Sequence, residues 1–214
     1  SGNDRLEGRG GNDTLDGNPG ADTLLGQDGS DRIIWNNGDG SDLIEGGDGN
    51  SDRVEVNGSL SGDDFLAQST PGSRVRFERT NLVPFVLDIA SVENLIVNAD
   101  SGGDTIALAD LSSTELQTAL LDLGIGSSDT VSVDGRSAAD TIETNPLGPS
   151  IVSIGGLAQA VTVQSIEPAD NLTVNGRGGA DTLVANALSI QDTLQYSPTD
   201  SDTGQLNGIG PGSI

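Results

Sequence analysis

Aspartate returns at regular intervals through the first part of the chain, and the residues around it return with it. Four aspartates are nine residues apart, and two more follow after eleven and ten residues. An aliphatic residue stands two positions after each, and glycine stands two positions before five of the six, with Asn50 in that place in the sixth. A flexible linker would not keep this phase, so the pattern predicts a folded repeat. The aspartates are Asp4, Asp13, Asp22, Asp31, Asp42 and Asp52, and the glycines are Gly2, Gly11, Gly20, Gly29 and Gly40.

The spacing is that of the nonapeptide repeat of parallel β-helices, and each position has a physical reason. Glycine lets the backbone turn tightly at positive φ and leaves carbonyl oxygens accessible. The aliphatic residue begins a short strand and points inward. Two repeats make one coil with a strand on each side, so aspartates eighteen residues apart stack in neighbouring coils. Such turn oxygens suit Ca²⁺, which takes roughly six to eight oxygen ligands in flexible geometry, better than Mg²⁺, which demands an octahedron.

The net charge also points to a need for cations. The chain carries 33 acidic and 9 basic residues, for a formal charge of −24, and every basic residue is arginine. This charge repels nucleic acid and anionic membranes, so neither is expected as a partner. It also opposes any compact state unless cations neutralise part of it. Histidine, cysteine and methionine are absent, which excludes disulfides, thiolate zinc sites and a cysteine nucleophile.

The apolar content is small but evenly distributed. Hydrophobic residues make up 33% of the chain and aromatic residues 2%, a level typical of disordered proteins. Valine, isoleucine and leucine nevertheless recur at regular places, which indicates a repeat architecture with a narrow core. No apolar run approaches the roughly 20 residues of a membrane span, so membrane insertion is not expected. The chain opens inside a repeat and without a signal peptide, and we expect it to be a segment of a longer protein.

The nonapeptide fades after Gly58, but the strand spacing continues. Short alternating segments such as 75–77, 86–89 and 151–154 predict strands, and nearly every step between strand centres from 54 to 183 is 9–11 residues. The sequence therefore predicts an all-β fold, a right-handed parallel β-roll or β-solenoid with two short strands per coil of about 18–20 residues. Four later segments repeat the order of valine, aspartate and apolar residue, with their aspartates at Asp63, Asp104, Asp140 and Asp181.

One step, from 106 to 122, is too long for this spacing. It contains Ser112 and Glu115 at the spacing of a helix capping box, which predicts a short helical insertion, and a slip in the strand register is the alternative. We expect three regions along the chain. They are a calcium-binding β-roll over 1–58, a degenerate continuation of the solenoid over 59–185, and a loop or further truncated coils over 186–214.

On these motifs, residues 2–58 resemble the calcium-binding β-roll of RTX (repeats-in-toxin) proteins. In that family, aspartate carboxylates and turn carbonyls bind Ca²⁺ between successive coils, and the resemblance implies several ions here. Arg9, Asn18 and Gln27 replace the second glycine of the motif, which implies weaker sites or sites that use other carbonyls. The implied metal ligands are Gly2, Asp4, Gly11, Asp13, Gly20, Asp22, Gly29, Asp31, Gly40, Asp42 and Asp52, with Asp4 paired to Asp22, Asp13 to Asp31 and Asp22 to Asp42.

The longer arrangement is similar to bacterial hemolysin-type calcium-binding proteins. In them, RTX repeats lead into a "GDGSD" turn and then into a region that contains "RVRF", "ENL" and "GGDT". Residues 38–42, 74–77, 93–95 and 102–105 carry these matches. The resemblance implies secretion by a type I system.

Three features outside the repeats are candidates for function. Arg74, Arg76 and Arg79 could bind acidic sugars, or they could face solvent and offset local negative charge. Trp35 could stack on a sugar ring, or it could cover the core where the regular roll changes to the looser solenoid. Asp104, Asp140 and Asp181 could bind further Ca²⁺, or they could cap turns through hydrogen bonds to backbone N–H groups. Chance carboxylate pairs are certain in so acidic a chain, so no catalytic residue is predicted.

The expected function is that of a non-enzymatic, calcium-stabilised structural module outside the bacterial cell or on its surface, in a coat, an adhesin or a fibre. Charge repulsion would keep the chain unfolded at low cytosolic Ca²⁺, and binding of Ca²⁺ after export would fold it. Calcium is the expected partner, and end-to-end stacking into filaments and surface glycans are further candidates. The alternative is an accessory, glycan-binding module of a polysaccharide-active enzyme such as a lyase or an epimerase.

Overall fold

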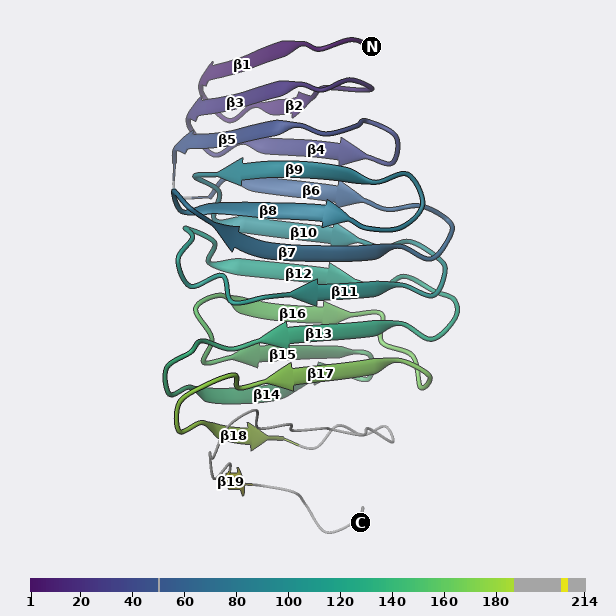
Figure 1. Cartoon of the computed structure of the whole chain (residues 1–214), viewed down its shortest axis with the longest axis vertical. Coiled ribbons are helices and arrows are strands. Elements are labelled where there is room, and N and C mark those ends of the chain that lie inside the picture. Colours follow the sequence, from purple (N-terminus) through teal and green to yellow (C-terminus); the bar gives the residue numbers. More distant parts are fainter. Residues whose placement is uncertain (50, 187–204, 208–214) are drawn as a thin grey trace.

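The computed structural model describes residues 1–49, 51–186 and 205–207. They form two β-sheets stacked face to face, and most strands of one sheet run opposite to most strands of the other (Figure 1). No helix occurs in this part of the chain, and thus none that could cross a membrane. The predicted C-terminal region, 186–214, lies almost wholly outside the described residues.

Successive coils add strands to the two sheets, so that most neighbours within a sheet are not consecutive in the sequence. In spatial order the first sheet holds β1 (Arg5–Gly10), β3 (Thr23–Asp28), β5 (Leu43–Asp48), β9 (Phe85–Ala90), β8 (Arg74–Arg79), β7 (Asp64–Thr70), β11 (Thr105–Leu108), β13 (Thr130–Asp134) and β17 (Asn171–Asn175). The second sheet holds β19 (Gln205–Asn207), β18 (Thr182–Ala185), β14 (Thr141–Gly148), β15 (Ile151–Gly155), β16 (Ala160–Gln164), β12 (Thr118–Asp122), β10 (Asn94–Asn98), β6 (Arg53–Asn57), β4 (Arg32–Asn36) and β2 (Thr14–Asp16).

Alternating side chains place one face of each strand in the core. Leu24 of β3 is fully buried and pairs in parallel register with Leu6 of β1 and with Ile44 of β5. One coil therefore takes 18 residues here and the next takes 20. This pairing confirms the predicted all-β architecture of stacked parallel strands.

The prediction of parallel strands throughout is wrong in two places. β7, β8 and β9 form an antiparallel meander in the first sheet, and β14, β15 and β16 form another in the second. Only residues 71–73 join β7 to β8, and only residues 149–150 join β14 to β15. Connections this short can join only antiparallel strands. The distance between strand centres is the same in a hairpin as in a coil, so periodicity alone cannot tell the two apart.

The helical insertion expected between β11 and β12 is also absent. Residues 109–117 form turns, in which the Ser112 N–H donates to Oδ1 of Asp110 at 2.9 Å. Leu111 and Leu116 are both buried against the core. Two anchored leucines five positions apart leave no length for a stable helix, because a helix needs several turns to offset the cost of starting it.

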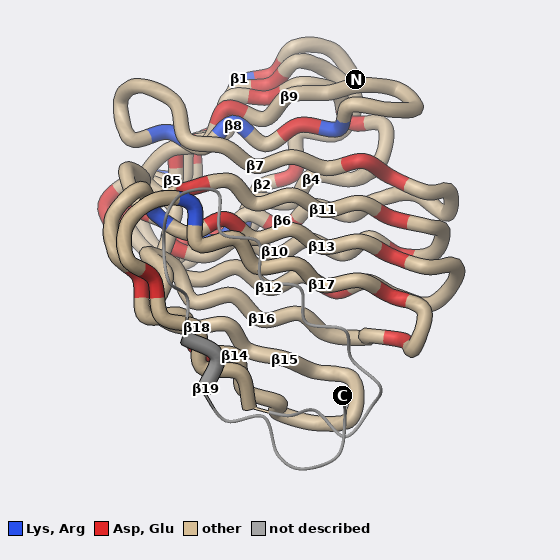
Figure 2. Tube along the Cα trace, turned by 60° about the horizontal axis from the view of Figure 1, so that its bottom comes forward, with Lys and Arg blue, Asp and Glu red and all other residues tan. Residues whose placement is uncertain are grey.

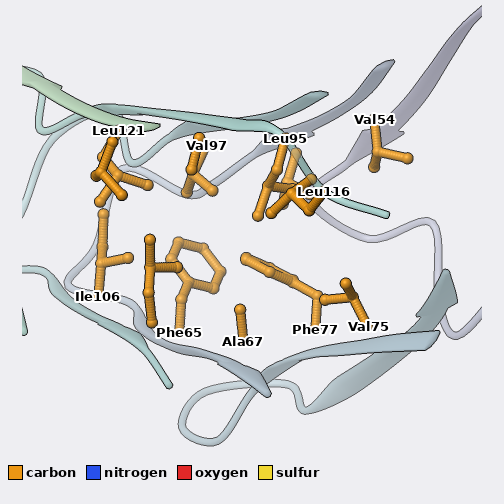
Figure 3. Packing of buried hydrophobic residues seen from close by; sticks show 14 of the residues in the cluster. Val54, Phe65, Ala67, Val75, Phe77, Leu95, Val97, Ile106, Leu116 and Leu121 are labelled. Atoms are coloured by element: carbon orange, nitrogen blue, oxygen red, sulfur yellow. The ribbon is translucent and has the colours of Figure 1, made fainter. Parts of the chain in front are cut away.

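The core is one apolar layer between the two sheets (Figure 3). Leu95 and Val97 of the second sheet face Phe65 and Phe77 of the first across this layer (Figure 3). Most strands contribute only two or three buried side chains to this layer, such as two from β4 and three from β9, in agreement with the low apolar content.

Trp35 belongs to this core. Its side chain is 1% exposed, its ring stacks on Phe85 with centroids 3.7 Å apart, and its Nε1–H donates to the carbonyl oxygen of Gly40 at 2.8 Å. Phe65 and Phe77 extend the cluster, with centroids 5.4 Å apart. The prediction that Trp35 covers the core is confirmed, and the sugar-stacking interpretation is wrong for this residue.

Trp35→Ala should therefore lower the free energy of unfolding by about 3–5 kcal/mol, the usual cost of truncating a large core side chain. Urea unfolding in saturating calcium, followed by circular dichroism, measures the change. Leu60→Ala is the control, because Leu60 is 76% exposed, and it should change stability by less than ~0.5 kcal/mol. Equal effects of the two substitutions would show that the aromatic cluster contributes nothing special.

Candidate metal centre

An aspartate ends the turn before each strand of the first coils, and these aspartates are joined into ladders. In every step the backbone N–H of one aspartate donates to Oδ1 of the aspartate one coil further along, at an N···O distance of 2.7–2.8 Å. Figure 2 shows the acidic residues gathered at the edges of the solenoid, where the turns lie. The structure thereby brings together all three predicted pairs, Asp4 with Asp22, Asp13 with Asp31 and Asp22 with Asp42, and adds Asp31 with Asp52.

The ladder uses only one oxygen of each carboxylate. In Asp13, Asp22, Asp31 and Asp52 the second oxygen, Oδ2, is buried and has no hydrogen-bond partner. Within the described residues, none of these four carboxylates forms a salt bridge. An ionised carboxylate is very costly to bury unless it is paired or coordinates a metal. The buried oxygens therefore call for a cation.

Backbone carbonyl oxygens lie close to these unpaired Oδ2 atoms. Glycine allows this approach, because it has no side chain at these positions. A Cβ on Gly8 would lie 2.7 Å from the carbonyl oxygen of Gly26 and 3.0 Å from Oδ2 of Asp13. A Cβ on Gly26 would collide with Oδ2 of Asp31 and with the carbonyl oxygen of Gly46. At both turns, an unpaired carboxylate oxygen and a carbonyl oxygen of the next coil thus approach one point. Carboxylate and carbonyl oxygens are the ligands of Ca²⁺, so these residues fit the predicted ion.

No three acidic side chains are placed to share one metal ion in the part of the chain that the structure describes. A bound ion would therefore depend on few carboxylates and would need carbonyl oxygens as well. That the eleven residues named from the sequence are the ligands remains a prediction.

The glycine two positions before each aspartate stacks on its counterpart in the next coil. The Gly11 N–H donates to the carbonyl oxygen of Asp28, and a Cβ on Gly29 would collide with the carbonyl oxygen of Gly11. In the sixth turn Gly49, three positions before Asp52, meets the carbonyl oxygen of Gly29, because this repeat is ten residues long. The same contact joins Gly2 to Gly20 and Gly20 to Gly40.

Arg9, Asn18 and Gln27 stand where the motif has its second glycine. Their φ angles are 76°, 58° and 75°, in the left-handed region that glycine favours. The replacements change the side chain but keep the course of the backbone. The turn therefore keeps its shape. It does so at a cost in backbone strain, because residues other than glycine disfavour left-handed φ angles.

The ladders continue beyond the nonapeptides. Asp129 and Asp170 belong to them although they were not predicted, and Glu93 takes the place of an aspartate beside Asp52. Asp129 and Asp170 each stand two residues before an aliphatic residue, and this spacing is the signal that identifies them in the sequence. The later steps run from Asp63 to Asp104, from Asp104 to Asp129, from Asp129 to Asp170 and from Asp140 to Asp181, at 2.7–2.9 Å.

In two later turns an arginine supplies the positive charge. Nη1 of Arg79, a side chain only 3% exposed, donates to Oδ1 of Asp63 at 2.9 Å, and the Ser59 N–H donates to Oδ2 at 2.7 Å. Nε of Arg136 donates to Oδ1 of Asp140 at 2.6 Å, and the Arg136 N–H donates to Oδ2 at 2.7 Å. Both carboxylates are fully paired. The prediction that the later aspartates cap turns is confirmed for Asp140.

The basic segment of β8 does not present one face. Arg74 and Arg76 pair with neighbouring carboxylates at 2.5–2.7 Å, which agrees with the prediction that they offset local negative charge. Arg79 instead shares the inward face with Val75 and Phe77, and its guanidinium lies over the rings of the aromatic cluster. The prediction that all three arginines face solvent is therefore wrong for Arg79, because side chains alternate along a strand.

Burial raises the pKa of several ladder carboxyls. The pKa of Asp42 and that of Asp104 are each raised to about 6, first by burial and then by repulsion from neighbouring aspartates. Burial likewise raises the pKa values of Asp39, Asp52 and Asp129. The repelling neighbours are Asp22, Asp39 and Asp16 for Asp42, and Asp129, Asp63 and Asp100 for Asp104.

Comparison with known proteins agrees with this geometry at one end of the solenoid. Residues 1–33 match the family model of the RTX calcium-binding nonapeptide repeat, in four copies. These residues include the turns that end at Asp4, Asp13, Asp22 and Asp31. No curated protein matches the chain.

Without calcium, the protein should become more stable as the pH falls from 7.5 to 5. The folded-state pKa of Asp42 and Asp104 is raised from 3.8 to about 6, so their contribution to stability is complete below about pH 4 and is lost as the pH rises through about 6. Circular dichroism in metal-depleted buffer at the two pH values measures the effect as the fraction of folded protein. Asp42→Asn should flatten the dependence, whereas Asp122→Asn should not, because the pKa of Asp122 is lowered. A larger folded fraction at pH 7.5 than at pH 5 would contradict this prediction.

Gly26→Ala should weaken calcium binding by tenfold or more, since its Cβ would displace Asp31 Oδ2 and the carbonyl oxygen of Gly46. Gly10→Ala is the matched control, because a Cβ there meets nothing within 4 Å. Calorimetric titration of both variants with Ca²⁺ provides the comparison. Equal affinities would mean that these two oxygens are not part of a calcium site.

Proposed function

We propose that the chain is a calcium-stabilised structural module that works outside the cell, because its residues 1–33 match the RTX calcium-binding nonapeptide repeat. In this proposal it is a non-enzymatic segment of a surface coat, an adhesin or a fibre. It is secreted through a type I system and folds when it meets extracellular Ca²⁺.

The observation that carries the proposal is the set of buried, unpaired Oδ2 atoms of Asp13, Asp22, Asp31 and Asp52. A fold that depended on no ion would gain by pairing these oxygens, as it does at Asp63 and at Asp140. Because the ladder occupies Oδ1 and leaves Oδ2 inside the turn, folding itself creates the demand for cations. The free energy of ion binding thereby becomes free energy of folding.

The charge of the chain supports a switch of this kind. At −24, the chain repels itself, and the pKa values of buried carboxyls raised to about 6 show that their ionised forms are unfavourable in the calcium-free fold. Cytosolic Ca²⁺ is too scarce to fill sites of moderate affinity, so the chain stays unfolded and can be exported. Extracellular Ca²⁺ then stabilises the folded form by mass action.

The architecture supports a structural role. Each coil contacts mainly its neighbours, as in other repeat proteins, and the stack forms a rod. End-to-end stacking of such rods into filaments is part of the proposal.

Circular dichroism with and without calcium tests the proposal. Added Ca²⁺ should produce the β-sheet spectrum in the chelated protein, and Asp31→Asn should raise the Ca²⁺ concentration at the midpoint by about tenfold or more, because it removes one buried anionic oxygen. Asp28→Asn is the matched control: it removes the same charge from the same turn at an exposed position and should barely move the midpoint. A spectrum and melting temperature that chelation leaves unchanged would rule out the calcium mechanism.

A further inference from the structure

One carboxylate outside the nonapeptides shares the unusual state of those inside them. Asp104 is 1% exposed, its Oδ1 accepts the Asp63 N–H at 2.7 Å, and its Oδ2 is buried without a hydrogen-bond partner. Among the described residues, the buried Oδ2 atoms of this kind belong to Asp13, Asp22, Asp31, Asp52 and Asp104. Asp104 lies far beyond residues 1–33, which match the repeat family.

The backbone of this turn has the nonapeptide shape without the nonapeptide sequence. Asp100, four positions before Asp104, has a φ of 77°, close to the 76° of Arg9. Gly102, two positions before Asp104, has a φ of 140°, close to the 145° of Gly29. The motif is hidden because Ala99 replaces the first glycine and Asp100 the second.

The later turns that need no ion show what is different here. At Asp63 and Asp140, the N–H four positions earlier donates to Oδ2, and a nearby arginine pairs with Oδ1. At Asp104 the equivalent residue is the left-handed Asp100, and no hydrogen bond to Oδ2 forms. No arginine forms a salt bridge to Asp104 in the described part of the chain.

The surroundings are rich in oxygen and open to solvent. Asp63 and Asp129 stand in the two neighbouring coils of the same ladder. A cavity of about 350 Å³ opens beside the turn, and Gly58, Asp100 and Gly124 are among the residues that line it. Solvent therefore reaches the turn at Asp100. A free carboxylate oxygen, such as Oδ2 of Asp104, is a ligand that hard divalent cations prefer.

We propose that the turn formed by residues 99–104 is a further calcium site, with Oδ2 of Asp104 as its anionic ligand. The site extends ion binding from the nonapeptide coils into the middle of the solenoid. It does not depend on the proposed function, because its ligand and its turn are separate from the matched repeats.

The test counts ions in the whole chain. Calorimetric titration with Ca²⁺ should show that Asp104→Asn binds one ion fewer than the unmodified chain, since the amide keeps an acceptor for the Asp63 N–H but loses the anionic oxygen. Asp140→Asn is the control, because that carboxylate is buried in the same kind of ladder but is already paired with Arg136, and it should bind the full number. An unchanged ion count in folded Asp104→Asn would overturn the proposal.

A measurement on the unmodified chain keeps the proposal testable if Asp104→Asn does not fold. Crystals grown with Ca²⁺ should show an anomalous peak at about 2.3–2.6 Å from Oδ2 of Asp104. Peaks at the nonapeptide turns without one at Asp104 would overturn this inference and leave the proposed function intact. A peak at Asp104 without any at the nonapeptide turns would overturn the proposed function and support this inference.

Discussion

The hydrogen bond from one aspartate N–H to Oδ1 of the next aspartate organises the whole solenoid. It fixes the distance between coils at the turn, and it holds each carboxylate so that its second oxygen points into the protein. A single geometric rule thereby produces both the stacking of coils and the demand for positive charge.

The positive charge that the ladder carboxylates need is supplied in two ways along the chain. In the first coils, glycine and left-handed residues bring carbonyl oxygens to the carboxylate, which suits an ion. At Asp63 and Asp140, a guanidinium and a backbone N–H satisfy the carboxylate directly. The antiparallel meander of β7, β8 and β9 stands between the ladder that ends at Asp42 and the one that begins at Asp63, and it carries Arg79 to that junction.

The sequence was enough to predict the all-β solenoid, because the repeat length, the glycine positions and the aspartate positions all indicate this fold. It could not predict strand direction at 64–90 or 141–164, since a hairpin and a coil advance by the same number of residues. The spacing of Ser112 and Glu115 predicted a helix because local capping rules ignore the burial of Leu111 and Leu116. The aspartate pairs were predicted from the repeat phase together with the resemblance to RTX β-rolls. The inward direction of Arg79 follows from the alternation of side chains along β8. The free oxygen of Asp104 was not predictable, because it depends on contacts between distant coils.

Arg79 has one property that no bound ion shares: it cannot diffuse away. A chelator strips charge from the first coils but leaves the guanidinium between Asp63 and the aromatic cluster. In a repeat protein each coil is supported mainly by its neighbours. The coils on either side of this junction therefore border a level whose charge balance does not depend on the calcium concentration.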